Sequence, residues 1–553
     1  MSVASGVLFL IAQVCVTQQV QLTGADSTHF DRFGCDVDIQ GDRIVVGAEY
    51  NRPIAIGTQT GSAYVFELVS GAWQELAQLT PNPPVPKGTF GHAVALDGST
   101  IAVGAPAVAQ SVPGGKGVVY VYTKSGTSWL QQAVIDPADA LAVGFGWDLA
   151  LDGDTLLIGA KDAGTGSTGL AYVYVRSGTT WTQQAKLGAS DATHDNSFGY
   201  SVALKGDTAI VCAGRADGVQ TETGAAYLYQ RSGVSWNEAQ KIFASDGNIQ
   251  DWFGIAVDYD GSTIAIGAVY CDTGAVNAHG AVYTFAKSGT QWVEQQKIRP
   301  KGYGQNEIAG CSVAVDGGAL AFGAPNEPQT PGFVHLATRS GSTWLQHLKI
   351  SSNDNWCVPG NPCIPAQLGS AIALQGSRVV AGAPVAEVAG LAQLGAVYVF
   401  DVPMQGAQPT FYCSVKTDSK GCMPRFFHAG APSVSGALAG ELYQVKGLDV
   451  RPKVPGMLFY STSGAANTPF AGGTMCIQQP QHPTQMALTA INGLTPPCNG
   501  QFSFDFNAWI ASGVDPNLSA GQTVWMQYWY RDPGGVPGAN IGLTDGIFVS
   551  ICP

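Results

Sequence analysis

The chain has 553 residues, of which only 12% are charged, 10% are aromatic and 71 are glycine, and its net charge is −13. This length predicts two or more domains. A Gly-rich and aromatic-rich composition with few charges favours an all-β protein with many turns. The acidity, without any Lys/Arg cluster, argues against nucleic-acid binding and against binding to anionic membranes.

The N-terminal segment is the one candidate for targeting. Residues 2–16, SVASGVLFLIAQVCV, are apolar but too short to span a bilayer. They resemble the apolar core of a signal peptide, although the first basic residue is Arg32, so the usual positive start is missing. We expect residues 1–15 to be a signal peptide or apolar leader of a secreted or cell-surface protein without membrane insertion.

A repeated unit runs from residue 16 to residue 401. In the copy at residues 145–187, four alternating runs are separated by Gly-containing turns, which predicts four short antiparallel strands, a to d. Each copy opens on Phe-Gly or a degenerate form of it, and successive copies are 53 to 59 residues apart. The seven openings are Phe33-Gly34, Phe90-Gly91, Phe145-Gly146, Phe198-Gly199, Phe253-Gly254, Ala309-Gly310 and Leu368-Gly369.

Two further glycines keep a fixed distance from each opening. The first lies seven positions on and follows Asp in four of the seven copies, as in Asp152-Gly153. We expect this pair to form a two-residue turn between strands a and b, because both turn residues need positive φ. The second belongs to Gly-Ala, thirteen positions on, and is replaced by Cys212 in the fourth copy.

Six tryptophans mark the d strands, each six positions before Leu or Ile: Trp73, Trp129, Trp181, Trp236, Trp292 and Trp344. Their period favours packing between repeats over sugar binding. The seventh copy has no Trp strand, but residues 16–22, VTQQVQL, match Trp181 to Leu187 in the third copy. We infer that this N-terminal strand completes the last sheet and closes a seven-bladed β-propeller.

The Phe-Gly…Gly-Ala pattern, followed by Pro106, Pro325 and Pro384 in three copies, resembles the FG-GAP repeat of integrin α chains. The Trp strand and Ser-Gly turn are most similar to the form found in secreted bacterial proteins. The resemblance implies an extracellular recognition or adhesion scaffold. Integrin-type repeats carry a calcium loop between strands a and b, but a two-residue turn cannot supply six to eight oxygen ligands. We therefore expect no metal and no other cofactor at that position.

Three of the connections from strand d to strand a carry polar residues at two shared positions: Asp26 and Asp31, Asp191 and Asn196, and Asp246 and Asp251. These side chains either fix the loops by bonding their own backbone or bind a ligand or metal. The b–c and d–a connections are long and irregular, whereas the other turns are tight. Because function tends to lie on variable loops over a rigid scaffold, we expect this face of a monomeric chain to bind an extracellular protein or polysaccharide.

Residues 402–410 read as a linker, and residues 411–553 as a Cys-containing β-sandwich domain. The strand candidates there are 411–416, 441–446, 456–461, 473–478, 502–507, 522–530 and 546–551. Disulfides are expected by proximity at Cys357–Cys363, Cys413–Cys422 and Cys476–Cys498, with the connectivity left open. Cys35, Cys212 and Cys311 are expected to be small buried fillers in the repeats.

The run from Trp525 to Asp532 is the most aromatic in the chain. Alternation places Trp525 and Trp529 on one face and Met526 on the other, so both faces are apolar. A buried central strand accounts for this pattern. The alternative is an exposed strip in which Trp525 and Trp529 stack on sugar rings.

Known catalytic and phosphate-binding motifs are missing from the sequence. The runs Ala93 to Leu96 and Ser201 to Leu204 predict a small, apolar channel lining, which argues against catalysis, although carboxylates from different blades can still converge there. The sequence therefore predicts a secreted or cell-surface, non-enzymatic binding or adhesion protein. The alternatives are a carbohydrate-binding module on a structural scaffold and a propeller enzyme.

Overall fold

The computed structural model describes residues 17–402 and, beyond them, the strands and helix given below together with residues 512–518. Within 17–402 the description omits residues 54–58, 86, 107–115, 193–195, 221, 272–278, 301–307, 327–331, 351–365 and 389–392. The chain divides into two compact units, one of which is Gln18–Asp401 and the other of which contains Val402–Pro553.

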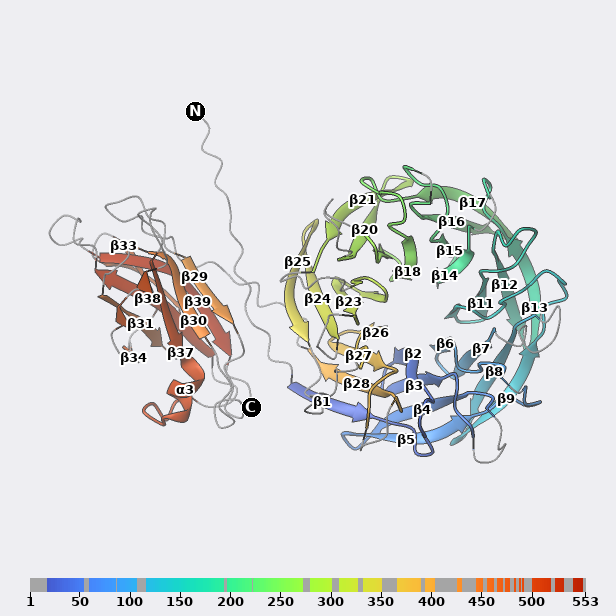
Figure 1. Cartoon of the computed structure of the whole chain (residues 1–553), viewed down its shortest axis with the longest axis horizontal. Coiled ribbons are helices and arrows are strands. Elements are labelled where there is room, and N and C mark those ends of the chain that lie inside the picture. The colour runs from blue at the N-terminus through green and yellow to red at the C-terminus, as the bar shows by residue number, and fades with distance from the viewer. Residues whose placement is uncertain are drawn as a thin grey trace. The chain divides into compact units, whose positions relative to one another are not determined.

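The first unit is a seven-bladed propeller, in which four-stranded antiparallel sheets are arranged as a ring around a common axis (Figure 1). Strand a of each blade is innermost and strand d is outermost. Blades 1 to 3 contain β2 (Phe33–Gln40), β3 (Arg43–Ala48), β4 (Ser62–Val69) and β5 (Ala72–Leu79); β6 (Val94–Asp97), β7 (Thr100–Ala105), β8 (Val118–Ser125) and β9 (Ser128–Ile135); and β10 (Leu149–Asp152), β11 (Thr155–Ala160), β12 (Leu170–Ser177) and β13 (Thr180–Leu187).

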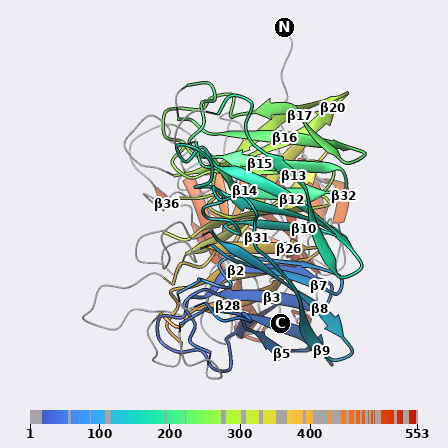
Figure 2. The same cartoon turned by 90° about the vertical axis from the view of Figure 1, so that its right-hand side faces the viewer.

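Blades 4 to 6 follow in the same order of strands. They contain β14 (Phe198–Lys205), β15 (Thr208–Ala213), β16 (Ala225–Ser232) and β17 (Ser235–Ile242); β18 (Phe253–Tyr259), β19 (Thr263–Ala268), β20 (Ala281–Ser288) and β21 (Gln291–Ile298); and β22 (Val313–Asp316), β23 (Ala319–Ala324), β24 (Phe333–Ser340) and β25 (Thr343–Ile350). Figure 2 views the ring from the side, where strands such as β12 and β16 run across it. We call the face with the b–c and d–a connections the loop face, and the opposite one the turn face.

Blade 7 is built from both ends of the repeat region. Its strands are β26 (Ala371–Gln375), β27 (Arg378–Ala383), β28 (Ala396–Asp401) and, on the outside, the N-terminal β1 (Thr17–Leu22). Gln21 on β1 donates a hydrogen bond to the Tyr398 hydroxyl on β28 at 3.1 Å, and Leu22 is buried. The predicted closure of the ring by the N-terminal strand is therefore confirmed.

The turn between strands a and b differs in detail from the prediction. Asp152 pairs with Thr155 inside the sheet, so the two turn residues are Gly153 and Asp154, not Asp152 and Gly153. Only the glycine has positive φ, 59°. This is the pattern of a turn with Gly at its first central position, so the residue before the glycine is free to serve as a strand residue.

The glycines of the repeat lie where neighbouring blades meet. A Cβ added to Gly104, on strand b of blade 2, would lie 2.2 Å from the carbonyl oxygen of Gly146, in the opening of blade 3. Equivalent contacts join Gly47 to Gly91, Gly159 to Gly199, and Gly382 to Gly34 across the closure. In the five blades that open on Phe, this ring packs edge-to-face against a Tyr on strand c, as in Phe33 and Tyr64, whose ring centroids are 5.2 Å apart.

The tryptophans of the d strands join neighbouring blades, as predicted. Trp181 donates its indole N–H to Gln132 on the preceding blade at 3.1 Å, and Trp236 donates to Gln184 at 2.8 Å. A cation lies over several of these rings, such as Arg231 over Trp236 at 5.2 Å. Their role is therefore packing between blades.

The described strands of the second unit form two larger antiparallel sheets and a hairpin. One sheet consists of β29 (Arg425–Ala429), β30 (Gln444–Val450), β37 (Gly500–Asp505) and β36 (Ala490–Ile491). The other consists of β34 (His482–Pro483), β31 (Pro455–Ser461), β38 (Thr523–Arg531) and β39 (Ile541–Ser550), with β35 (Ala487–Leu488) also paired to β31. A hairpin, β32 (Ala465–Phe470) with β33 (Gly473–Ile477), completes the unit, and β29 lies against β39 where the sheets meet.

Several predictions for this unit need correction or lie outside the described residues. Strands β29 and β32 were not expected, and the candidate strand 411–416 falls outside the described part. The candidate 502–507 runs into a short helix, α3 (Phe506–Ala511), which Asp505 caps by accepting from the N–H groups of Asn507 and Ala508. The predicted disulfides involve cysteines whose side chains are not described.

Candidate functional site

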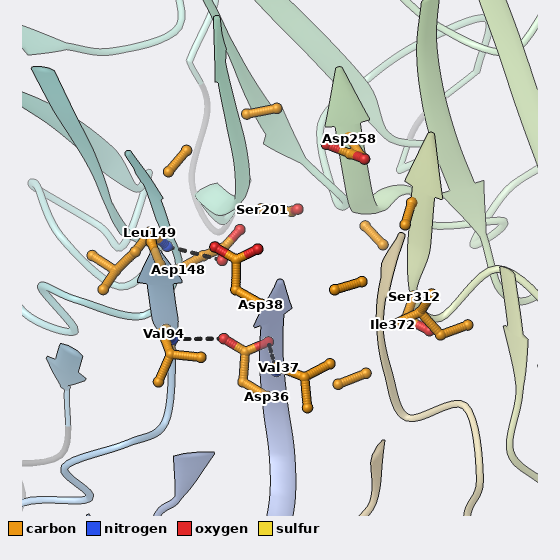
Figure 3. A pocket seen from close by; sticks show the side chains of 18 of the residues that line it. Asp36, Val37, Asp38, Val94, Asp148, Leu149, Ser201, Asp258, Ser312 and Ile372 are labelled. Atoms are coloured by element: carbon orange, nitrogen blue, oxygen red, sulfur yellow. Dashed lines mark hydrogen bonds between the residues drawn. The ribbon is translucent and has the colours of Figure 1, made fainter. Parts of the chain in front are cut away.

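The a strands of all seven blades enclose a cavity of about 740 Å³ on the propeller axis. Alternate side chains of these strands point into it (Figure 3). The predicted runs Ala93 to Leu96 and Ser201 to Leu204 lie on its wall. The lining is nevertheless not wholly apolar, because Asp36, Asp38, Asp148 and Asp258 face the cavity from blades 1, 3 and 5.

Each of these four carboxylates joins two blades. One oxygen accepts from the backbone N–H of the next residue, and the other accepts from the a strand of the next blade. The bonds between blades run from Val94 to Asp36 (2.6 Å), Leu96 to Asp38 (2.6 Å), Val202 to Asp148 (2.7 Å) and Val315 to Asp258 (2.7 Å). This role was not predicted from the sequence. Its signal is the alternation in FGCDVDIQ, which places Asp36 and Asp38 two positions apart on one strand.

The surroundings of these carboxylates favour the protonated form. Burial among the strands raises the pKa of Asp38 to about 7 and the pKa values of Asp148 and Asp258 to about 6, against the opposing effect of the backbone hydrogen bonds. The pKa of Asp36 is also raised, by the same cause. Each side chain retains partial exposure to the cavity, yet the surrounding blades displace most of its solvent.

At the turn face, the residue before each turn glycine reaches the next blade. Asp97 accepts from Gly153 N–H at 2.6 Å, and Asp316 accepts from Gly376 N–H at 2.7 Å. Asp152, Asp260, Gln40 and Gln375 make the equivalent bonds. In blade 4 the position is Lys205, which cannot accept and instead pairs with Asp152 at 2.8 Å. The turn face is therefore cross-linked by its own side chains.

At the loop face, blades 1, 3, 4 and 5 carry a set of aromatic and basic side chains, of which Arg32, Trp147 and Tyr200 line the cavity. We call this set the channel mouth: Arg32, Tyr50, Trp147, Lys161, Tyr200, Arg215, Trp252 and Tyr270. Tyr200 lies near the start of a strand a, and the others precede a strand a or follow a strand b, so the antiparallel order of each blade brings them to the same face. Tyr50 and Tyr270 are 38% and 41% exposed.

The side of the mouth formed by blades 1 to 4 is organised around Glu49 and Trp147. Glu49 is buried, and it accepts hydrogen bonds from Arg32 and, at 2.7 Å, from His92 Nδ1. Burial opposes its ionisation, but the bond from His92 and the charges of His92 and Arg32 outweigh burial and lower the pKa of Glu49. The His92 ring lies 4.4 Å from Trp147, whose ring is 5.8 Å from Tyr200.

Three rings of the mouth carry cations of the chain itself. Lys161 Nζ lies 4.1 Å from the centroid of Trp147, Arg215 lies 5.4 Å from that of Trp252, and Arg32 lies 5.5 Å from that of Tyr50. Trp252 also packs edge-to-face on Tyr270 at 5.0 Å. The mouth can therefore present positive charge on rigid aromatic supports.

Comparison with known proteins identifies a family for the repeat. The FG-GAP repeat family matches residues 16–66, 73–122, 129–174, 181–229 and 236–285, each segment running from strand d of one blade through strands a to c of the next. The chain carries FG-GAP repeats. They build the propeller that encloses the channel and the mouth. No curated protein matches the chain.

In this FG-GAP propeller, the first residue of each predicted loop pair lies against the blade that it precedes. Asp191 accepts from the Tyr227 hydroxyl at 2.7 Å and from Lys241 at 2.6 Å, and Asp246 accepts from Tyr283 and Lys297, each at 2.7 Å. Asp26 accepts from Tyr64 and Gln78. Asp139 makes the same contacts with Tyr172 and Lys186. No role for Asp139 was predicted from the sequence, because Asp139 precedes Phe145 by six positions instead of seven.

The second residue of each pair positions the mouth. Asp31, Asn196 and Asp251 are all buried. Their backbone carbonyls accept from the N–H groups of Tyr50 (3.3 Å), Arg215 (3.4 Å) and Tyr270 (3.3 Å). The Asp31 carboxylate also accepts from Asn51 at 2.8 Å. The structure thus provides internal partners for the loop residues, while their direct binding to a ligand stays a prediction.

The remaining candidates are not among the residues of the mouth. Trp525 and Trp529 are on β38, between β31 and β39, where Val524 and Met526 are buried, so this is the central strand that the sequence predicted. Stacking of the two tryptophans on sugars stays a prediction. Cys212 is a buried filler as expected, whereas Cys35 and Cys311 line the cavity, and burial raises the pKa of the Cys311 thiol to about 12.

Among the described residues, no group of three or more His, Cys, Asp and Glu side chains is arranged to hold a metal ion. Helices that are long and apolar enough to cross a bilayer are likewise missing from the described part of the chain.

Proposed function

We propose that this FG-GAP propeller is a secreted or cell-surface binding protein without enzymatic activity, and that it engages an extracellular protein or polysaccharide through the channel mouth. The observation that carries the proposal is the concentration of half-exposed aromatic rings and basic side chains at one opening of the channel. Aromatic residues and arginine are the side chains that contribute most to binding surfaces. The fold supplies a rigid support for them, which is the usual arrangement in adhesion scaffolds.

The two faces of the ring differ in a way that supports this choice. At the turn face, charged and amide side chains form hydrogen bonds between blades, such as Asp97 with Gly153 and Asp316 with Gly376. At the loop face, Tyr50, Tyr270 and Arg215 extend into solvent. A partner therefore finds exposed aromatic and basic side chains at the mouth.

The channel carboxylates favour a structural role over an enzymatic one. Asp36, Asp148 and Asp258 each accept one bond from their own strand and one from the next blade. A general acid or base needs an oxygen free to exchange a proton with a substrate. These carboxylates instead hold neighbouring strands together.

The test uses the full chain on arrays of glycans and of purified cell-surface proteins. Trp147→Ala and Trp252→Ala remove rings at the mouth, and Trp181→Ala is the matched control, because Trp181 lies on an outer strand and bonds to Gln132. We expect the wild type and the control to bind the same spots and both mouth variants to lose them. Absence of any bound spot, or equal loss in the control, contradicts the proposal.

A further inference from the structure

We infer that the channel mouth binds an anionic polysaccharide whose sugars carry carboxylates, that is, a uronate chain. The inference rests on the proposed function and names the partner class for the same surface. It starts from the three rings that carry cations of the chain itself, at Trp147, Trp252 and Tyr50. Since a cation of the chain already lies over each of these rings, a cationic ligand would have to displace it in order to bind there.

At the mouth itself the acidic side chains are paired with cations or buried, whereas the channel carboxylates Asp36, Asp38, Asp148 and Asp258 accept backbone hydrogen bonds and have raised pKa values. Glu49 is held between Arg32 and His92, and Asp162 pairs with Lys161 at 2.8 Å. Asp31 and Asp251 are 1% and 2% exposed. An incoming anion is therefore not repelled by an unpaired carboxylate among these residues.

Arg215 is the cation best placed to receive an anion. It is exposed, it lies over Trp252, and the described ion pairs of blade 4 use Lys205, Arg231 and Lys241 instead. Its guanidinium lies 5.4 Å from the centroid of the indole, and the N–H fork of an arginine matches the two oxygens of a carboxylate. Contact with the ring lowers the entropy that the side chain loses on binding.

The surroundings of Arg215 favour a sugar over an extended peptide. A peptide that binds by adding a strand needs a free sheet edge, but the N–H groups of Val94, Leu96, Val202 and Val315 along the channel already donate to carboxylates. Beside Arg215, Tyr270 is half-exposed and packs on Trp252. A ring of this kind, apolar on its face and polar at its hydroxyl, suits a sugar that is apolar on one side and polar at its edge.

The experiment measures binding of the full chain to polygalacturonate and to methyl-esterified polygalacturonate of the same length. Esterification removes the carboxylate charge and keeps the sugar. Poly-glutamate of matched charge is the peptide arm. We expect binding to polygalacturonate that weakens with salt, and little binding to the ester or to poly-glutamate.

The matched control for Arg215→Ala is Arg231→Ala. Both arginines belong to blade 4, and each lies over a tryptophan, at 5.4 Å for Arg215 and 5.2 Å for Arg231. They differ in that Arg231 lies at the turn face. Arg215→Ala should raise the Kd for polygalacturonate by about tenfold or more, the scale of one charge-assisted hydrogen bond, whereas Arg231→Ala should leave it within about twofold. Arg215→Lys keeps the charge but loses the fork, so its Kd should lie between those of the wild type and Arg215→Ala.

Equal binding of the ester, equal or tighter binding of poly-glutamate, or equal effects of the two alanine variants would overturn the inference. So would no binding of polygalacturonate by the wild type. If the array experiment still shows spots that depend on Trp147 and Trp252, only the uronate assignment fails. If those spots are missing as well, the proposed function fails with it.

Discussion

The Asp36 carboxylate accepts a hydrogen bond from the backbone N–H of Val94 at 2.6 Å, which ties the innermost strand of blade 1 to that of blade 2. Strand a has a neighbour within its sheet on one side only, so its N–H groups toward the next blade have no strand to pair with. Asp36, Asp38, Asp148 and Asp258 satisfy four of these groups. The propeller thus closes its inner edge with side chains.

These carboxylates make stability depend on pH. The pKa of Asp38 in the folded protein is about 7, above its usual value of 3.8, because burial disfavours the charged form. The folded state therefore holds this proton more tightly than the unfolded state does. The stabilisation is complete below about pH 4 and is lost as the pH rises through 7. We expect the melting temperature of Asp38→Asn, relative to the wild type, to increase by roughly 2 °C or more between pH 4.5 and 8.

At low pH the same variant should be less stable than the wild type, because the amide nitrogen cannot accept from both Ile39 and Leu96. Thermal melts at a series of pH values measure both effects. A constant difference in melting temperature between the two proteins across this range would show that Asp38 does not titrate there.

Substitution of two glycines of blade 2 distinguishes the stability cost of a steric clash from the cost of an unfavourable backbone conformation. A Cβ on Gly104 would lie 2.2 Å from the Gly146 carbonyl oxygen of the next blade, whereas a Cβ on Gly98 meets no atom within 4 Å but requires φ of +57°. We expect Gly104→Ala to lower the free energy of unfolding by about 3 kcal/mol. Gly98→Ala should lower it by about 1 kcal/mol. Urea denaturation tests the order, and a larger cost at Gly98 would contradict it.

The bonds at the turn face should be worth more than nearby surface ion pairs. Asp97 reaches Gly153 of the next blade, whereas Asp154 pairs with Arg176 of its own blade at 2.6 Å and is 67% exposed. Asp97→Ala should destabilise the protein by about 1 to 2 kcal/mol, and Asp154→Ala by less than about 0.5 kcal/mol. Equal changes in the denaturation midpoint would show that Asp97 does not link the blades.

Calcium should leave the melting temperature unchanged. The loop carboxylates already accept from groups of the chain, such as Lys241 at Asp191 and Lys297 at Asp246. A cation would have to displace these ammonium groups before binding. Melts in excess calcium and in EDTA test this, and a higher midpoint with calcium would show that the loops bind the metal.

The mouth was not predictable from sequence, although the face that carries it was. Tyr50, Arg215 and Tyr270 share one position after strand b, but the residue type changes from blade to blade. Trp147 and Trp252 come from two other positions, after and before the Phe-Gly opening. These residues form no motif, and they come together only because the ring brings the ends of different blades to one opening.

In blade 6, one contact of the core was likewise not predictable from the sequence. Its opening has Ala309 in place of Phe, and strand c has His335 in place of Tyr. Phe322 from strand b stacks on His335 with ring centroids 5.0 Å apart. The sequence reveals a degenerate copy, but the substitute partner depends on packing between strands.

The sequence by itself determined the strands, the number of blades and the closure by residues 17–22, because alternation, turn glycines and a regular period are local properties of the chain. Tertiary structure alone decided that the residue before the turn glycine binds the next blade, that Asp36 satisfies Val94, and that Lys161 and Arg215 lie on aromatic rings at the mouth. These contacts join residues of different blades or loops, and their partners are set by the geometry of the ring.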